Sequence, residues 1–300
     1  MAEASSLYVN GQKLLMKDGE ARAKGEAALE MAALLRSQSI DQFGGRSLAV
    51  QFANEILNFD DEWAWLQDRV KEGKFDGLMI GDYLDVTLTS GFQMRYRIGA
   101  IDPYYRVGDS ANVMGHNIAM VPDETVPVTG SFATNGDHIM WNTTNTNQGT
   151  AAEKSPYLVS NLHKWEEDVF KALLPKIVRD RILPRRVLLE ERYSAAGAQA
   201  NPTGWAWKTV NIWSLSEIEV YGHPLWATNG YAMGSDSHFP LFAQWKDRIR
   251  DATGTRETWW LRVPSASSST NACFVYENGL GNAYAATNTW IRPLPCFLIG

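Results

Sequence analysis

The chain has 300 residues, of which 45% are hydrophobic and 21% are charged, and its formal net charge is −6 at pH 7. This length allows one large core or two domains. An acidic chain whose only local basic run is Arg179–Arg186 attracts nucleic acid weakly, so no nucleic-acid partner is expected. The 12 tryptophans indicate an aromatic-rich core or an exposed recognition surface, and we expect most of them in the core.

The N-terminus lacks the features of a secretion signal. Its first residues, MAEASSLYVNGQKLL, contain no basic segment followed by a long apolar stretch. No window of the sequence reaches the roughly 18 uninterrupted apolar residues that a spanning helix needs. We therefore expect a protein that is made in a cytoplasm without a signal peptide and does not insert into a membrane.

Residues 1–74 have the pattern of a helical, modular segment. Asn10 and Gly11 stand between two short apolar runs, which predicts a β-hairpin. Ala, Glu, Leu and Arg then recur at helical spacing. The expected elements are strands over 7–9 and 13–16 and helices over 20–36, 48–57 and 60–72.

At Phe75 the apolar period changes to that of strands, because FDGLMIGDYLDVTL alternates and carries two glycines. Many short strands follow, with only two convincing helices, over 160–173 and 241–252. Trp141–Ser155 and Gly197–Trp207 are polar stretches that predict long exposed loops. The expected fold class is therefore α+β, with a helical N-terminal segment before a domain of short strands, two helices and long loops.

Nothing in the sequence specifies an enzyme. The five histidines do not form a HExxH motif, and there is no GxSxG turn. Asp137-His138 and Asp236-Ser237-His238 suggest parts of a triad, but an Asp near a His is common in loops. We expect no catalytic residues and no cofactor.

The cysteines and acidic residues favour structural roles. Cys273 and Cys296 are the only cysteines, and without a CxxC or Cys/His cluster no metal site is expected. A disulfide and two buried free thiols are both open, and cytoplasmic synthesis favours the thiols. Ser216 and Glu219 have the spacing of a helix capping box.

Five segments together resemble a family of phage and prophage proteins catalogued as a domain of unknown function. The strongest are WWLRVP and RPLPCFL near the C-terminus, although Val263 replaces the commoner serine and the second motif matches more loosely. The resemblance covers roughly residues 75–300 and implies a C-type-lectin-like fold, as used by phage variable receptor-binding proteins. The segments are Lys74–Val86, Ser155–Phe170, Val210–Gly222, Trp259–Gly279 and Ile291–Gly300.

In the related variable proteins, the segment between the two terminal strands carries the exposed, diversified side chains. Here that segment is rich in Ser, Asn, Tyr and Gly, the residue types that dominate binding loops. Arg262 and Arg292 in the flanking strands are expected to fix the frame by pairing with acids or carbonyls. An ordinary solvent-exposed loop is the alternative interpretation. The expected ligand-binding residues are Ser265, Ser267, Ser268, Thr270, Asn271, Tyr276, Asn278, Asn282, Tyr284, Asn288 and Trp290.

The resemblance implies a virion protein, such as a tail fibre, that is made in the host bacterial cytoplasm. Residues 1–74 would attach to other virion proteins and oligomerise, as a trimer by analogy with phage fibres. Residues 75–300 would form the C-type-lectin-like domain and bind a host cell-surface receptor, either protein or glycan. Calcium is not expected, because the sugar-binding triplets EPN and QPD are absent. The alternatives are a structural virion protein, such as a head decoration or head fibre, and, least favoured, an enzyme acting on cell-surface polysaccharide.

Overall fold

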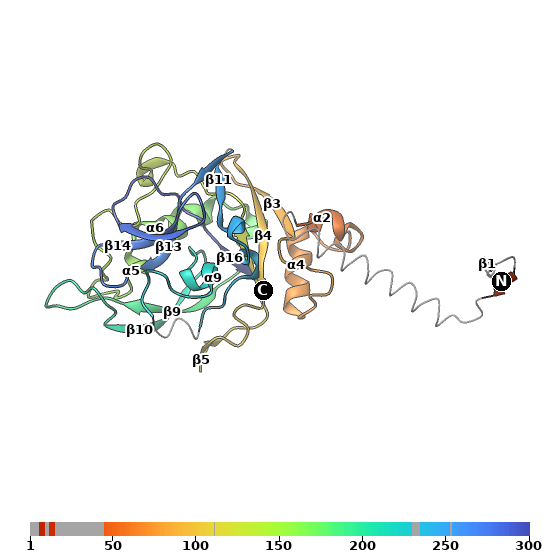
Figure 1. Ribbon diagram of the computed structural model, residues 1–300, viewed down its shortest axis with the longest axis horizontal. Coiled ribbons are helices and arrows are strands. Elements are labelled where there is room, and N and C mark those ends of the chain that lie inside the picture. Colours follow the sequence, from red (N-terminus) through yellow and green to blue (C-terminus); the bar gives the residue numbers. More distant parts are fainter. Residues whose placement is uncertain (1–5, 10–11, 16–44, 111, 230–234, 253) are drawn as a thin grey trace. The chain divides into compact units, whose positions relative to one another are not determined.

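The computed structural model describes residues 6–9, 12–15, 45–110, 112–229, 235–252 and 254–300 (Figure 1). The chain divides into two compact units, Met1–Gly44 and Gly45–Gly300. In the first unit β1 (Ser6–Val9) pairs antiparallel with β2 (Gln12–Leu15). The predicted N-terminal hairpin is confirmed, whereas the helix predicted over 20–36 lies outside the described residues.

The larger unit contains a five-stranded antiparallel sheet with the order β3-β4-β7-β16-β8. Three of its strands, β3, β4 and β16, are labelled in Figure 1. The last strand of the chain, β16, lies between β7 and β8, with Leu298 opposite both Ala119 and Leu183. A strand that pairs on both sides and is buried on both faces must be apolar throughout, as Phe-Leu-Ile is here. The strands are β3 (Tyr83–Thr87), β4 (Gln93–Ile101), β7 (Ile118–Pro122), β8 (Ile182–Leu183) and β16 (Phe297–Ile299).

A second antiparallel sheet has three strands in the order β13-β14-β15. These are the expected WWLRVP strand and the two strands that follow it, and in the described part of the chain β15 pairs only with β14. The strands of this sheet and of the two-stranded ladders are β13 (Trp259–Pro264), β14 (Asn271–Val275), β15 (Gly281–Ala285), β5 (Gly108–Asp109), β6 (Asn112–Val113), β9 (Arg185–Glu191), β10 (Gly204–Val210), β11 (Arg250–Ala252) and β12 (Thr255–Glu257).

The helices of the larger unit are short. The helices predicted over 48–57, 60–72 and 160–173 are confirmed, the first with a break at Phe52 and the last with a π-helical turn in its middle. The elements are α2 (Leu48–Gln51), α3 (Ala53–Ile56), α4 (Glu62–Lys71), α5 (Pro156–Val159), α6 (Asn161–Trp165), the π turn η2 (Glu166–Phe170), α7 (Lys171–Leu173), α8 (Lys176–Arg179), α9 (Glu217–Tyr221) and the 3-10 turns η1 (Gly130–Phe132), η4 (Pro240–Phe242) and η5 (Trp245–Arg248).

The helix predicted over 241–252 is wrong. Two separate 3-10 turns, η4 and η5, occupy its first part, and β11 occupies its end. The Asp247 carboxylate accepts a hydrogen bond from the Gln244 N–H at 3.3 Å, so a new turn starts there. Pairing of β11 with β12 then draws the end of the segment into a strand. These contacts override the local helical pattern.

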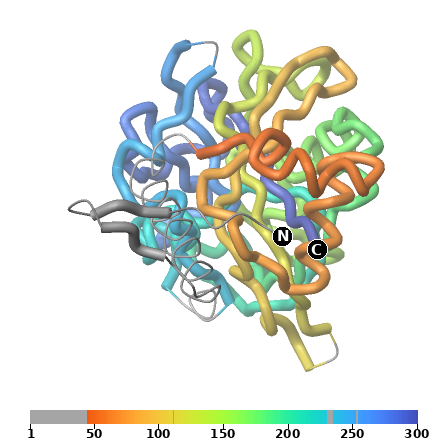
Figure 2. Tube along the Cα trace, turned by 90° about the vertical axis from the view of Figure 1, so that its right-hand side faces the viewer, coloured from red at the N-terminus to blue at the C-terminus, as the bar shows by residue number. Residues whose placement is uncertain are grey.

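Residues 45–74 belong to the larger unit and pack on its sheet. Figure 2 shows this orange segment beside the C-terminal end of the chain. The Gln67 side chain donates to the carbonyl oxygen of Gly300 at 3.0 Å, and Arg46 pairs with Asp82 at 2.6 Å. The compact units therefore divide at Gly44, whereas the sequence places the domain boundary at residue 74. The attachment role of residues 1–74 stays a prediction.

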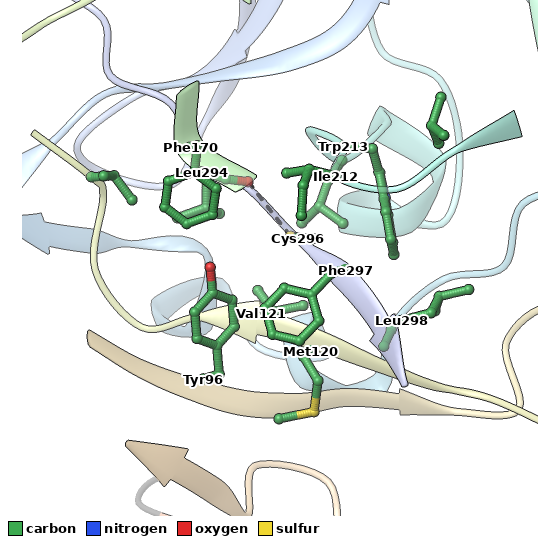
Figure 3. Close-up of a cluster of buried hydrophobic side chains, with 14 of the residues drawn as sticks. Tyr96, Met120, Val121, Phe170, Ile212, Trp213, Leu294, Cys296, Phe297 and Leu298 are labelled. Atoms are coloured by element: carbon green, nitrogen blue, oxygen red, sulfur yellow. Dashed lines mark hydrogen bonds between the residues drawn. The ribbon is translucent and has the colours of Figure 1, made fainter. Parts of the chain in front are cut away.

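The aromatic core surrounds β16. In Figure 3, Tyr96 of β4 and Met120 and Val121 of β7 lie around Phe297. The Phe297 ring centre lies 4.6 Å from that of Tyr96 and 6.0 Å from that of Trp63. The Tyr96 hydroxyl donates to the carbonyl oxygen of Pro295 at 3.0 Å, which satisfies this buried polar group. Burial of the C-terminal strand thus joins the sheet to α4.

The two cysteines are free and buried, which confirms the expected thiols. The Cys296 thiol lies 3.5 Å from the Leu294 carbonyl oxygen in the same cluster (Figure 3). Burial raises the pKa of both thiols well above the ordinary value. Both side chains therefore act as small apolar residues of the core.

Strands predominate over short helices in this unit, as the α+β pattern predicts. None of the helices in the described ranges combines the length and apolar character that crossing a bilayer requires. The C-type-lectin-like assignment stays a prediction.

We expect Phe297→Ala to reduce the free energy of unfolding by about 3–5 kcal/mol, because it leaves a cavity at the centre of the core. Urea denaturation of the full chain measures this loss. The control is Leu57→Ala, because Leu57 is 82% exposed and its truncation should change stability by at most about 0.5 kcal/mol. Similar effects of the two substitutions would contradict the central place of β16.

Candidate functional site

A closed ring of two guanidinium groups and two carboxylates lies inside the larger unit. Arg185 contacts Glu219 Oε1 through Nη1 at 2.8 Å and Asp236 Oδ1 through Nη2 at 2.8 Å. Arg262 pairs with the second oxygen of each of these carboxylates. All four residues are buried. Because each charge faces two opposite charges, mutual attraction offsets the cost of removing the groups from water.

The surroundings of the ring supply further polar partners. The Tyr104 hydroxyl donates to Glu219, and the Ser216 hydroxyl donates to Asp236 Oδ2 at 2.8 Å. The Arg185 guanidinium also stacks over the Tyr104 ring, 4.0 Å from its centre. The ion-pair ring formed by Arg185, Glu219, Arg262 and Asp236 therefore connects β9, β13 and the start of α9.

The ring sets the ionisation of its carboxylates. Burial is the largest single influence on the pKa of Glu219 and by itself would raise it. The attraction of Arg185 and Arg262, added to the hydrogen bonds from Arg262 and Tyr104, outweighs burial and lowers this pKa to about 2. Burial raises the pKa of Asp236, against the attraction of Arg262.

Helix α9 is fixed at both ends. The Ser216 hydroxyl accepts from the Glu219 N–H at 3.3 Å, and Glu219 Oε2 accepts from the Ser216 N–H at 2.6 Å. This arrangement confirms the predicted capping box. Gly222 ends the helix with φ of 82°, a conformation that favours glycine. The ring thus determines where α9 begins, and α9 carries Glu217 and Tyr221.

Glu217 fixes the loop that follows α9. Its buried carboxylate accepts hydrogen bonds from the backbone N–H groups of Leu225 at 2.6 Å, Trp226 at 2.9 Å and Ala227 at 2.9 Å. With its backbone held in this way, Trp226 presents its indole at the surface, where 49% of the residue is exposed.

The turn between β14 and β15 is held by aromatic side chains. Its backbone closes with a hydrogen bond from the Tyr276 N–H to the Leu280 carbonyl oxygen at 2.8 Å. The carbonyls of the turn then accept hydrogen bonds from two indoles and one phenol. The pairs are Trp245 Nε1 with Asn278, the Tyr221 hydroxyl with Gly279 at 3.2 Å, and Trp226 Nε1 with Gly281 at 3.1 Å.

These side chains line a pocket that is open to solvent, and we call it the aromatic pocket. Its volume of about 480 Å³ lies in the range of small-molecule sites. Trp245 is 55% exposed, and the Arg248 guanidinium lies 4.7 Å from the centre of the Tyr221 ring. The lining residues are Tyr221, His223, Leu225, Trp226, Trp245, Arg248, Gly279, Leu280 and Gly281.

Gly281 is needed for this packing. A Cβ atom at this position would lie 2.6 Å from Leu225 Cδ1 and 3.1 Å from Tyr221 Cε2. The absence of a side chain lets the turn approach the two walls closely enough to accept their hydrogen bonds.

Two buried side chains, Arg192 and Asn147, hold the backbone of the polar segment 265–271. Buried Arg192 donates to the carbonyl oxygens of Ser265 at 3.0 Å and Ser268 at 2.8 Å. The Asn147 side chain donates to the carbonyl oxygens of Ser268 at 2.9 Å and Asn271 at 2.7 Å. The segment is therefore a fixed loop, although its sequence is typical of a mobile one.

The loop expected to be exposed over Trp141–Ser155 is exposed only in part. Trp141 and Asn147 are fully buried, whereas Thr143–Asn145, Thr150–Ala152 and Lys154 are exposed. The indole N–H of Trp141 donates to the Leu261 carbonyl oxygen at 3.0 Å, so the polar atom of this buried side chain has a partner. This loop supports the segment 265–271 and is not a free display loop.

The expected binding residues occupy different environments. Ser265 is buried, whereas Ser267, Asn278, Tyr284 and Trp290 are exposed. The others are half-buried, namely Ser268, Thr270, Asn271, Tyr276, Asn282 and Asn288. None of these residues lines the aromatic pocket. Asn278 lies next to it, where its carbonyl oxygen accepts from the Trp245 indole, and the neighbouring Gly279, Leu280 and Gly281 form part of the lining.

Sequence reasoning missed the main walls of the pocket. Tyr221, Leu225, Trp226, Trp245 and Arg248 lie outside the segment that the resemblance singled out. The sequence gives no signal that separates these indoles from the buried ones, since Trp245 shares helical spacing with Leu241 and Ile249.

The Asp–His neighbours have structural partners. His138 lies between two carboxylates, with Nδ1 3.0 Å from Asp137 Oδ1 and Nε2 3.5 Å from Glu257 Oε2. Arg292 contacts the same two carboxylates. Asp236 is engaged by the ion-pair ring. Arg262 and Arg292 therefore pair with acids and fix the strands that flank the polar segment, as expected. The described residues contain no cluster of three or more His, Cys, Asp and Glu that could hold a metal.

We expect Arg262→Met to reduce the free energy of unfolding by about 3–5 kcal/mol, because it leaves two buried carboxylates with one guanidinium. The control is Arg95→Met, because Arg95 pairs with exposed Asp85 at the surface and should contribute only about 0–1 kcal/mol. Urea denaturation compares the two, and equal losses would show that the ring is not a special constraint.

A second prediction concerns Glu190, which lies 2.6 Å from Arg192 Nε. Burial outweighs the attraction of Arg192 and raises the pKa of Glu190 to about 7. The unfolded chain releases this proton near pH 4.5, so folding stability should fall as pH rises to 7, on the order of 3 kcal/mol. Glu190→Gln should remove this slope. Denaturation of both proteins at pH 5 and pH 7.5 measures the difference, and parallel pH profiles would contradict it.

The sequence matches a known protein family, and the description of that family assigns no activity. The family described as "Domain of unknown function (DUF6273)" matches residues 131–299, which include the ion-pair ring, the aromatic pocket and both terminal sequence motifs. No curated protein and no solved structure shows significant similarity to the chain. Because the match covers more than half of the sequence, this protein belongs to the DUF6273 family.

Proposed function

We propose that the protein is a virion-associated receptor-binding protein of a phage or prophage, and that it contacts the host surface through the aromatic pocket. The observation that carries this proposal is the pair of half-exposed indoles, Trp226 and Trp245, in an open pocket. Tryptophan is the residue type most enriched at binding hot spots, and exposing it in water has no benefit for folding.

Rigidity of the pocket supports a binding role. Trp226, Trp245 and Tyr221 each donate a hydrogen bond to a carbonyl of one turn, so their rings hold their orientation without a ligand. A preformed site loses little conformational entropy on binding, which raises affinity for a given contact area. The ion-pair ring and Glu217 extend this support into the protein interior.

The exposed side of β15 adds polar and aromatic groups next to the turn that borders the pocket. Tyr284 is exposed and Asn282 is half-exposed, and they alternate with Ala283 along the strand. The Asn282 side chain contacts the Tyr276 hydroxyl at 3.3 Å. These expected binding residues would therefore form the rim of a larger contact surface around the pocket.

The virion setting rests on the sequence resemblance described above. In this proposal residues 75–300 adopt a C-type-lectin-like fold with residues 45–74 packed on its sheet, and the N-terminal part of residues 1–74 attaches to other virion proteins and forms a trimer. Several pockets on one particle would raise a weak affinity for a host surface by multivalency. The protein needs no enzymatic activity for this role.

The test is attachment of labelled full-length protein to candidate host bacteria. The double variant Trp226→Ala/Trp245→Ala should bind at least about tenfold more weakly, as expected for hot-spot indoles. Trp290→Ala is the matched control, since Trp290 is 66% exposed and does not line the pocket. Thermal melting of each variant shows whether its fold is intact.

Loss of attachment in the control alone would move the site to the face around Trp290. Absence of attachment by the parent protein would reject receptor binding for those hosts. The structural alternative, a head decoration or head fibre, would then be the better account.

A further inference from the structure

We infer that the aromatic pocket binds a carboxylate-bearing sugar residue of a cell-surface polysaccharide. This inference rests on the proposed function, because it names the ligand class of the same pocket. It is carried by the hydrogen bonds of the two indoles, by the charges that line the pocket, and by the position of Arg248.

The indoles offer their faces and not their N–H groups. Both Nε1 atoms donate to backbone carbonyls, at Gly281 for Trp226 and at Asn278 for Trp245. A ligand therefore meets a flat π surface whose negative face attracts weakly positive C–H groups. A pyranose ring presents such C–H groups on one face and hydroxyl groups at its edge, which fits an aromatic wall open to water.

The pocket lining carries positive and neutral groups only. Among its described residues Arg248 and His223 are basic, and no carboxylate is present. Arg248 has no acidic side chain within ion-pair distance in the described part of the chain, and its Nη2 makes one long hydrogen bond, 3.4 Å, to the Phe242 carbonyl oxygen. A planar guanidinium in this state can bind a carboxylate through two parallel hydrogen bonds.

The same geometry disfavours a cationic ligand. Quaternary ammonium groups bind in cages of aromatic faces. Here the Arg248 guanidinium already covers the Tyr221 ring at 4.7 Å, and a second cation would be repelled.

An extended peptide fits less well. Peptides that add to a sheet need a free strand edge in the groove, and those that bind aromatic grooves use oriented polar groups along their backbone. The pocket is lined by the turn 279–281, and β15 residues beyond Gly281 are not part of its wall. The carbonyls of the turn are already engaged by aromatic donors.

The test is binding of the labelled full chain to an immobilised panel of neutral, amino and carboxylated saccharides. We expect binding to carboxylated members above their neutral counterparts. Trp226→Ala and Trp245→Ala should each weaken it by about tenfold or more. Arg248→Gln should equalise carboxylated and neutral members while leaving both tryptophans in place. Tyr105→Ala removes an exposed aromatic side chain that neither lines the pocket nor belongs to the expected binding residues, and it should bind as the parent protein does.

Several results would overturn the inference. Equal binding to neutral and carboxylated saccharides, or an unchanged preference in Arg248→Gln, would remove the role of the carboxylate. If no saccharide binds while attachment to cells still depends on Trp226 and Trp245, the sugar is wrong and the receptor-binding proposal stands. Loss of that attachment after protease treatment of the cells would then identify a protein receptor. If neither saccharides nor cells bind, both proposals fail.

Discussion

The buried ring of Arg185, Glu219, Arg262 and Asp236 is the constraint on which the rest of the larger unit depends. Its members come from β9, α9, β13 and the segment before η4, so four parts of the chain must meet before any charge is compensated. An apolar cluster of the same volume is often equally stable, since the desolvation cost of the ions is large. The ion-pair ring adds geometric specificity, because a planar guanidinium forms good hydrogen bonds with carboxylates only over a narrow range of positions. The ring therefore restricts the positions that the surrounding backbone can adopt.

That placement extends to the surface through short connections. Glu219 completes the capping box at the start of α9, and Tyr221 is the last residue of the same helix. Glu217, the first residue of α9, accepts hydrogen bonds from the loop that carries Trp226. The aromatic side chains then hold the turn that completes the pocket. Each step uses a buried or half-buried polar group that would cost free energy if left without a partner. The pocket is thus a consequence of how the interior satisfies its hydrogen bonds, and its indoles need no ligand to keep their orientation.

Local patterns in the sequence identified the features that depend on neighbouring residues. The capping box at Ser216, the helix over 160–173 and the N-terminal hairpin all follow from residues a few positions apart. The helix expected over 241–252 failed because β11 pairs with β12, a contact that helical periodicity does not include. The exposure of Trp226 was equally hidden. It results from Glu217 and Gly281, and no single-sequence pattern distinguishes a surface indole held in this way from one of the buried indoles.

In the proposed receptor-binding role, a fixed backbone would let the side chains of the contact surface vary. The Ala266 N–H donates to the Trp226 carbonyl oxygen at 2.6 Å, and Arg192 holds the carbonyl oxygens of Ser265 and Ser268. These bonds join the pocket loop to the polar segment through main-chain atoms, which are the same for every residue type except proline. Exposed side chains such as Tyr284, on the paired strand β15, can likewise change without altering the main-chain hydrogen bonds beneath them. In the proposed role, the residues that determine shape, which are buried and charged, are distinct from the exposed residues that would contact a ligand.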